Sequence, residues 1–194
     1  MMPFIEIVRQ YFDPVAKNFR MKHISNSDFE VCYKNEQVSM RINFDCNRSY
    51  ELDVRISKNT PLSDAFSLAE ILRLKNVYNA VSTSLGGTMA SEKNKLSICL
   101  EKLAVLTSNY AEDFIRGDES AFTKLAQLRN EESKKLERES MLSIVRAKAN
   151  SAWKEKDYQG VISAYDGAEN HLVPSEKKRL EYARKRLVAE EREE

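Results

Sequence analysis

Four charged residues near one predicted β-turn have the side-chain types that metal-dependent hydrolysis requires. Asp45 and Glu51 flank the turn, and Asp53 and Arg55 follow Glu51 at alternating positions. Carboxylates gathered in this way can hold Mg²⁺, which is the basis of metal-dependent phosphoryl chemistry. These residues therefore carry the catalytic hypothesis that the sequence offers, a metal-dependent nuclease.

The segment Asp53-Val54-Arg55 resembles the carboxylate-x-lysine pattern of one nuclease superfamily. Arg55 stands where that pattern has its lysine, and the spacing to the upstream acid is short. The chain has no GxSxG, GxGxxG or GxxxxGK(S/T) motif. Its two histidines, His23 and His171, stand alone in the sequence, which gives no reason to expect a zinc site. We therefore expect no catalysis and no cofactor, and keep the nuclease as an alternative below a binding function.

The composition indicates a protein without a dominant charge. The chain has 194 residues, with 31 Lys and Arg against 30 Asp and Glu and a formal net charge of +1. This balance excludes nucleic-acid binding by bulk charge alone. The sequence shows neither a signal peptide nor a membrane-spanning run, and its three cysteines are widely spaced. We expect a cytoplasmic protein that binds another protein and makes no membrane contact; the oligomeric state stays open.

Hydrophobic periodicity predicts an α+β fold. Apolar residues at helical spacing indicate a helix that starts near Phe4 and ends at Asp13, because Pro14 disfavours helix in the residue before it. The period then changes to two, which is typical of half-buried antiparallel strands. Short connections favour a meander of four strands, at 19–23, 29–34, 38–45 and 50–57.

One face of the predicted meander is apolar and should form the core. Ser67 and Glu70 make a capping box that starts a helix ending near Lys75. We expect this helix and the N-terminal one to cover the apolar face, which includes Tyr33, Met40, Ile42, Leu52 and Val54.

The register of the strands can be argued from charge, because directly opposed residues share a face of a sheet. Opposing Phe44 to Tyr50 brings Arg41 opposite Asp53, whereas the neighbouring register would oppose Arg41 to Arg55 and Asp45 to Glu51. We therefore predict the first register. A two-residue turn at Asn35-Glu36 likewise opposes Glu30 to Arg41, and continuing outward brings Lys22 beside Glu30. Exposed pairs of this kind contribute under about 1 kcal/mol each, so the row can also be purely structural. These pairings place Lys22, Glu30, Arg41 and Asp53 in one charged row across the solvent face of the sheet. The candidate partner-binding residues are this row and the neighbouring Arg55: Lys22, Glu30, Arg41, Asp53 and Arg55.

The second half of the chain is predicted to be helical throughout. A long amphipathic helix is expected over 92–116, and Gly117 ends it. We predict a helix-and-meander subdomain at 1–89, a helical subdomain at 90–194, and a boundary at Gly86-Gly87.

Residues 143–174 carry small and apolar residues in the order of a helical repeat. The run Asp157-Tyr158-Gln159-Gly160-Val161-Ile162 leads to Tyr165, Ala168 and Pro174, with Ala149 and Ala152 before it. This resembles the second half of one tetratricopeptide repeat, although Lys156 and Val145 replace the family's glycine and tryptophan. A peptide groove needs at least about three repeats. The resemblance therefore implies a helical hairpin that packs on the rest of the chain, followed by a helix at 175–190.

The order of elements along the whole chain is similar to a loose group of small bacterial α+β proteins. The features that carry this likeness are the Asp45 to Tyr50 turn, the segment Phe66 to Leu72, and a helix ending at Gly117-Asp118. Similar proteins often neutralise secreted bacterial toxins as immunity partners. The resemblance implies a protein-binding module whose partner is a toxin domain.

The C-terminal helix offers an alternative binding face. Basic residues and one tyrosine share a broad side of it, opposite Leu180 and Leu187. A basic face with an aromatic residue could follow the phosphates of a nucleic acid, while neighbouring glutamates dilute its charge. Nucleic-acid binding is therefore the alternative to protein binding, with the candidate residues Lys178, Arg179, Tyr182, Lys185 and Arg186.

Overall fold

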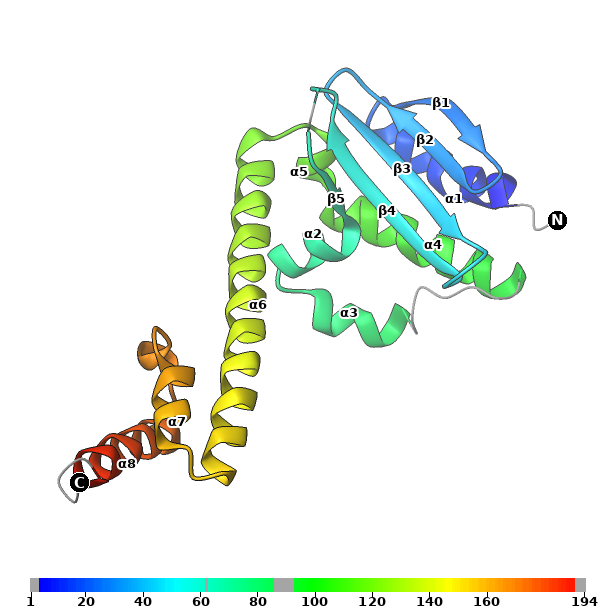
Figure 1. Ribbon diagram of the computed structural model, residues 1–194. Coiled ribbons are helices and arrows are strands. Elements are labelled where there is room, and N and C mark those ends of the chain that lie inside the picture. Colours follow the sequence, from blue (N-terminus) through cyan, green and yellow to red (C-terminus); the bar gives the residue numbers. More distant parts are fainter. Residues whose placement is uncertain (1–3, 62, 86–92, 191–194) are drawn as a thin grey trace. The chain divides into compact units, whose positions relative to one another are not determined.

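The protein has an α+β fold, as its sequence predicts (Figure 1). The computed structural model describes residues 4–61, 63–85 and 93–190. Within these residues, the sheet is antiparallel and its strands follow one another in chain order. The strands are β1 (Lys22–Ser27), β2 (Glu30–Lys34), β3 (Val38–Asp45), β4 (Glu51–Lys58) and β5 (Ala65–Ser67).

Contacts divide the chain into two compact units, residues 1–129 and residues 130–194. The long helix α6 (Glu119–Lys154) contributes to both. This division differs from the predicted subdomains 1–89 and 90–194, and the predicted boundary at Gly86-Gly87 lies outside the described residues.

In the first unit, helices cover one face of the sheet. Helix α1 (Phe4–Asn18) contacts β1 and β2, α2 (Leu68–Leu74) contacts β4 and β5, and α4 (Lys93–Tyr110) contacts α1 and β4. Helix α3 (Tyr78–Leu85) contacts α2, and the short α5 (Glu112–Ile115) contacts β3. The predicted apolar face is confirmed, because the side chains expected to form it are all buried: Tyr33, Met40, Ile42, Leu52 and Val54.

Helix α4 belongs to the same core as the sheet, which explains the shift of the unit boundary. Its residues Leu96, Leu100 and Leu103 are buried in one cluster with the strands. The predicted helix over 92–116 is in fact α4 and α5, separated at the buried Ala111. A pattern of apolar residues shows that a helix has a buried side but not which element covers it.

The register predicted for β3 and β4 is wrong. Arg41 lies opposite Arg55, and Asp45 lies opposite Glu51. These are the two like-charge pairs that the prediction had avoided. Both registers keep the same residues on the buried face, so this error leaves the face assignment intact.

Turn chemistry explains why the like-charge register forms. The carboxylate of Asp45 accepts hydrogen bonds from the Arg48 backbone N–H at 3.2 Å and the Ser49 hydroxyl at 3.1 Å. The Asp45 carbonyl accepts the Tyr50 N–H at 2.7 Å. These bonds fix the loop with Asp45 and Glu51 as its closing pair. Repulsion between exposed like charges is worth well under about 1 kcal/mol, so the turn prevails.

The other two predicted registers are also wrong. Glu30 lies opposite Asn43 rather than Arg41, and Lys22 lies opposite Lys34 rather than Glu30. In the hairpin between β2 and β3, the Asn35 side chain accepts the Val38 N–H at 2.8 Å and sets the turn one residue later than predicted. The alternating charged row is therefore absent.

Three local expectations need correction. Helix α1 continues through Pro14 to Asn18, because Val15 and Ala16 are buried against the core and offset the cost of about 3 kcal/mol for an internal proline. The first strand is Lys22–Ser27 rather than 19–23. The sheet also has a fifth strand, β5, whose three residues are too few to show an alternating pattern.

The second unit is helical. After α6 come α7 (Tyr158–Tyr165), the short 3₁₀ helix η1 (Glu169–His171) and α8 (Pro174–Glu190). Helix α7 packs on α8 around buried Val161, Tyr165 and Leu180. No helix among the described residues of the chain is long and apolar enough to traverse a lipid bilayer.

Candidate functional site

A groove of about 930 Å³ lies in the first unit, along one end of β4. Strand β5 pairs with Arg55, Ile56 and Ser57 only, and the chain then turns into α2. The part of β4 from Glu51 to Val54 consequently has no strand beside it on that side within the described residues (Figure 1). The groove runs along this part of the strand.

The backbone groups on this side of β4 can be identified from the hydrogen-bond pattern. In an antiparallel sheet, the N–H and C=O groups of successive residues point to opposite sides. The Phe44 N–H donates to the Phe29 carbonyl, away from β4, and the Tyr50 N–H donates to Asp45. Asp45 therefore faces β4, and its partner Glu51 faces β3. By alternation, the residues whose N–H and C=O groups point outward are Leu52 and Val54.

One wall of the groove is apolar. It includes Leu68 and Leu72 from α2, Tyr78 from α3 and Leu103 from α4. These side chains lie on the helix-covered side of the sheet, where Leu52 and Val54 also point. Leu52 and Val54 are themselves buried, with exposed fractions of 3% and 0%, so the outward backbone groups of this part of β4 are covered.

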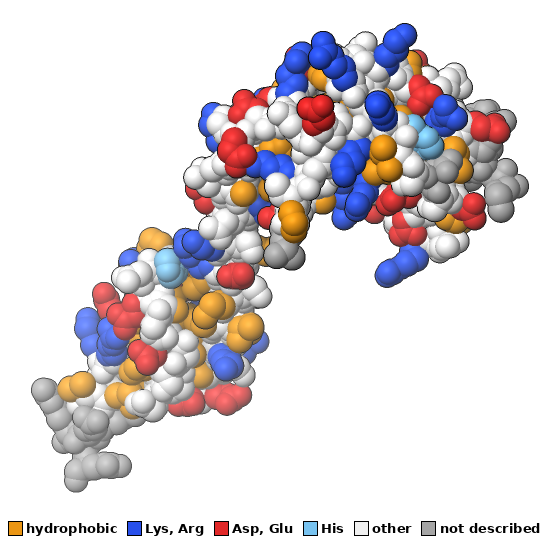
Figure 2. Space-filling model, turned by 90° about the horizontal axis from the view of Figure 1, so that it is seen from above, with side chains coloured by type: hydrophobic (Ala, Val, Ile, Leu, Met, Phe, Trp, Pro, Cys, Tyr) orange, Lys and Arg blue, Asp and Glu red, His pale blue; other side chains and the backbone are white. Residues whose placement is uncertain are grey.

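The other side of the groove is charged, with more acidic than basic side chains. Arg55 is paired with Asp53 at 2.6 Å, and Glu51 forms no ion pair with any described residue. Basic and acidic side chains are intermingled over the face seen in Figure 2. The lining has five carboxylates against three guanidinium groups: Glu30, Asp45, Glu51, Asp53 and Glu70 against Arg41, Arg55 and Arg129.

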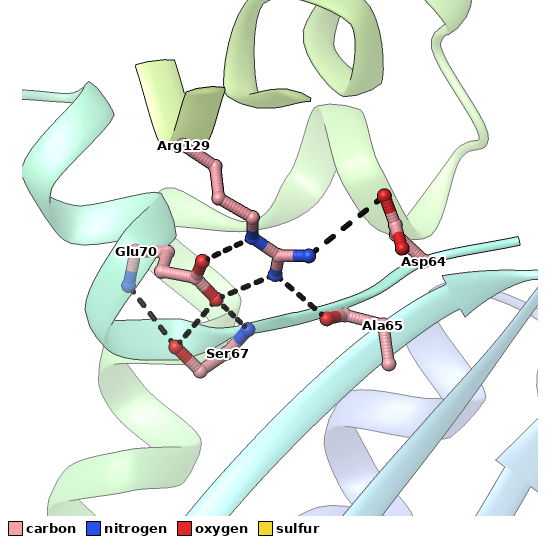
Figure 3. A network of polar contacts seen from close by, with 5 residues as sticks. All are labelled: Asp64, Ala65, Ser67, Glu70 and Arg129. Atoms are coloured by element: carbon pink, nitrogen blue, oxygen red, sulfur yellow. Dashed lines mark hydrogen bonds and ion pairs between the residues drawn. The ribbon is translucent and has the colours of Figure 1, made fainter. Parts of the chain in front are cut away.

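An ion-pair network closes the groove where α2 begins (Figure 3). Arg129 donates to both carboxylate oxygens of Glu70, at 2.7 and 3.0 Å, and to the Ala65 carbonyl at 2.8 Å. The Arg129 guanidinium also lies over the Phe66 ring, 4.1 Å from its centroid. Glu70 accepts the Ser67 N–H, which completes the predicted capping box. Arg129 thereby ties α6 to β5 and α2.

The network lowers the pKa of the Glu70 carboxyl group. Burial alone would raise the pKa of this carboxyl group. The hydrogen bonds from Arg129 and Ser67 outweigh burial and hold the pKa below its ordinary value. Glu70 is therefore ionised in the groove wall at neutral pH.

The structure gathers four of the five predicted partner-binding residues in this groove, although not in the predicted row. Glu30, Arg41, Asp53 and Arg55 line it, and Lys22 does not. Sequence reasoning missed Glu70 and Arg129 as site residues, because they are 59 positions apart. It also missed the groove, which lies along the part of β4 that the short strand β5 does not reach.

The acidic residues of the nuclease hypothesis lie where β3 ends and β4 begins. Asp45 and Glu51 lie opposite each other, and Asp53 is engaged with Arg55. Among residues 4–61, 63–85 and 93–190, no three His, Cys, Asp or Glu side chains converge as metal ligands would.

A second surface lies in the other unit, on the predicted basic face of α8. Tyr182 packs edge-on against Trp153 and Tyr158, with ring centroids 5.5 and 5.9 Å apart. Arg179 lies over the Trp153 ring and Arg186 over the Tyr182 ring. The sequence predicted Arg179, Tyr182 and Arg186 for this face, and the fold adds two aromatic rings from other helices.

No protein-family model, curated protein or solved structure matches this chain. The functional argument therefore depends on the geometry of the two surfaces.

Proposed function

We propose that this chain is a non-enzymatic protein-binding module whose partner docks in the groove along β4. The observation that carries the proposal is the groove itself, where a surplus of carboxylates lies beside an apolar wall.

The charge of the groove supports a bacterial toxin domain as the partner, acting in the cytoplasm. The resemblance to immunity proteins favours this class, and many toxins that act on nucleic acid are basic, which calls for an acidic inhibitor surface. The whole chain is nearly neutral, with a net charge of +1. The groove nevertheless has an acidic surplus where a partner would dock.

Site-specific photo-crosslinking in the native host tests the proposal. A photoreactive residue at Asp53 should capture the partner, whereas the same residue at Lys34, on the solvent face but outside the groove, should not. The identified partner is then purified and its affinity measured for the wild type and for Glu51→Lys/Asp53→Lys. We expect affinity to fall by about tenfold or more. Equal affinity of both proteins would refute docking in the groove.

Nucleic-acid binding by α8 is the second candidate, favoured by the rings that the fold adds to its basic face. Aromatic side chains on which bases can stack, with arginines beside them, are common in single-strand binding sites. The exposed Lys178 and Lys185 test it, because Arg179 and Arg186 already contact rings of the protein. Fluorescence anisotropy with a labelled single-stranded oligonucleotide should show binding that weakens with salt, and less steeply in Lys178→Ala/Lys185→Ala. Absence of binding at low salt would reject this candidate.

A further inference from the structure

The solvent face of the sheet is the one opposite the helices of the first unit (Figure 1). From the charges on this face, we infer that it binds a second copy of this chain, with the two sheets face to face. Binding of a second copy requires no toxin partner.

The strand register sorts the charges of this face by sign along the strands. Side chains that alternate with the buried ones lie here, and opposed residues on neighbouring strands lie at the same level. Equal numbers of cations and carboxylates gather toward the two ends of the strands, which makes the face complementary to itself. The basic end holds Lys22, Lys34 and Arg41, and the acidic end holds Glu30, Asp45 and Glu51.

Within one chain, the basic end opposes like charges. Lys22 lies opposite Lys34, and Arg41 lies opposite Arg55. Among these four residues, Arg55 alone has a described carboxylate partner, Asp53, at 2.6 Å. Directly opposed like charges destabilise a sheet. A bound molecule that presents carboxylates to this end would relieve the repulsion.

The acidic end has the same need for the opposite charge. Asp45 lies opposite Glu51. Neither Glu51 nor Glu30 forms an ion pair with a described residue. The turn bonds of Asp45 fix this register, so the two carboxylates stay side by side whatever binds. The cations that would compensate them lie at the other end of the same strands.

A twofold axis satisfies both ends at once. An axis that lies between the two sheets and runs across the strands places the basic end of each copy over the acidic end of the other. With the axis between the levels of Arg41 and Asn43, Arg41 lies over Asn43 of the second copy. Glu30 is opposite that asparagine in the register, so it comes within reach of the guanidinium. The symmetry makes this contact twice.

The size of the face predicts a weak dimer. With strands about 4.8 Å apart and about 3.3 Å of rise per residue, one face of this five-stranded sheet covers about 500 Å². Two copies would bury about 1,000 Å² in total, which is at the lower limit of specific interfaces. Because the contacts join exposed charges, added salt should weaken the dimer.

The second copy and the proposed partner would exclude each other. Glu30, Arg41 and Asp53 belong to this face and also line the groove. A second copy seated on the face would therefore cover residues that the partner contacts.

Sedimentation velocity on the purified full-length protein tests self-association. At low salt, the average mass should rise with concentration from the 22.4 kDa of one chain toward twice that value, and added salt should reverse the rise. Arg41→Glu and Glu30→Lys should each weaken self-association by about tenfold or more. Lys17→Glu, on α1, matches Arg41→Glu in charge change and should have no effect.

A mixture of the two variants tests the face-to-face geometry. In a dimer of one Arg41→Glu chain and one Glu30→Lys chain, opposite charges meet again at both contacts. We expect native mass spectrometry to show the mixed dimer at about the wild-type affinity, although neither variant pairs with itself. Its recovery would also show that both variants fold, and circular dichroism of each variant checks this separately.

A monomer at every concentration in low salt would overturn the inference. Self-association that Arg41→Glu does not weaken would place the contact elsewhere on the chain and overturn it too, as would folded variants that form no mixed dimer. These results would leave the proposed function standing, because photo-crosslinking at Asp53 tests it separately. A salt-sensitive dimer that the mixture restores, together with unchanged partner affinity in Glu51→Lys/Asp53→Lys, would refute the proposed function and support the dimer.

Discussion

Replacing Arg129 with methionine isolates the network that closes the groove. Methionine keeps an apolar stem beside Phe66 but removes three hydrogen bonds, two to Glu70 and one to the Ala65 carbonyl. The Glu70 side chain is 17% exposed and Arg129 is 36% exposed. The pair therefore falls between an exposed ion pair, worth up to about 1 kcal/mol, and a buried one whose disruption costs about 3–5 kcal/mol.

We expect Arg129→Met to lower the free energy of unfolding of the first unit by about 2 kcal/mol at neutral pH. The expected loss is below the buried range because Glu70 keeps its bonds from Ser67, at 2.8 Å from the N–H and 2.9 Å from the hydroxyl. Glu70→Gln should cost less than Arg129→Met, since an amide oxygen can still accept the Ser67 N–H.

The pH dependence gives a second test of the same network. The pKa of Glu70 is depressed in the folded chain, so its stabilising contribution is present above its ordinary pKa of 4.5 and is lost as pH falls through the folded value. The gap between wild type and Arg129→Met should therefore narrow in acid. Only the smaller contribution of the Ala65 hydrogen bond should remain.

The assay must report on the first unit, and the single tryptophan, Trp153, lies in the second. We would therefore follow amide hydrogen exchange of the segment 63–75, which includes β5 and α2, over a urea series at neutral and acidic pH. A loss below about 0.5 kcal/mol at neutral pH, or a loss that stays the same in acid, would refute the role assigned to the network.

Two further substitutions test packing and capping. Leu52→Ala should lower unfolding free energy by about 2–5 kcal/mol in urea melts followed by circular dichroism, because Leu52 is buried; a loss under about 0.5 kcal/mol would contradict its place in the core. Gly160→Ala should cost about 1 kcal/mol in melts followed by Trp153 fluorescence, because an added Cβ would collide with the Asp157 carboxylate that caps α7 through the Gly160 N–H at 2.8 Å. If loss of this cap is the cause, adding Gly160→Ala to a chain that already carries Asp157→Ala should lower the unfolding free energy only slightly further.

The fold class and the buried face were predictable because they depend on local periodicity. Alternation with period two survives any shift of register by two residues, so Ile42 and Val54 are buried in both the predicted and the observed pairing. The capping box at Ser67 was predictable for the same reason, since its partners are three residues apart. The packing of α4 on the sheet depends on residues far apart in sequence, and periodicity does not report it.

The candidate site was only partly predictable. Glu30, Arg41, Asp53 and Arg55 were identified from charge and do line the groove. The groove itself depends on where β5 ends and on an ion pair between Glu70 and Arg129, which no local pattern links. The sequence therefore indicated which charges face solvent, and the tertiary structure decides which of them share a cavity.

The register of β3 and β4 can be tested by reversing the charge of Arg41. In the structure Arg41 lies opposite Arg55 and Cys32, so Arg41→Glu would create a cross-strand ion pair worth about 0.2–1 kcal/mol over a neutral pair. In the rejected register the new glutamate would lie directly between Glu30 and Asp53 and would destabilise the sheet. Arg41→Ala is the neutral reference, and because Arg41 is exposed it should change stability by less than about 1 kcal/mol. We expect urea melts followed by circular dichroism to show a higher free energy of unfolding for Arg41→Glu than for Arg41→Ala. The opposite order would show that the strands pair as charge alone predicts.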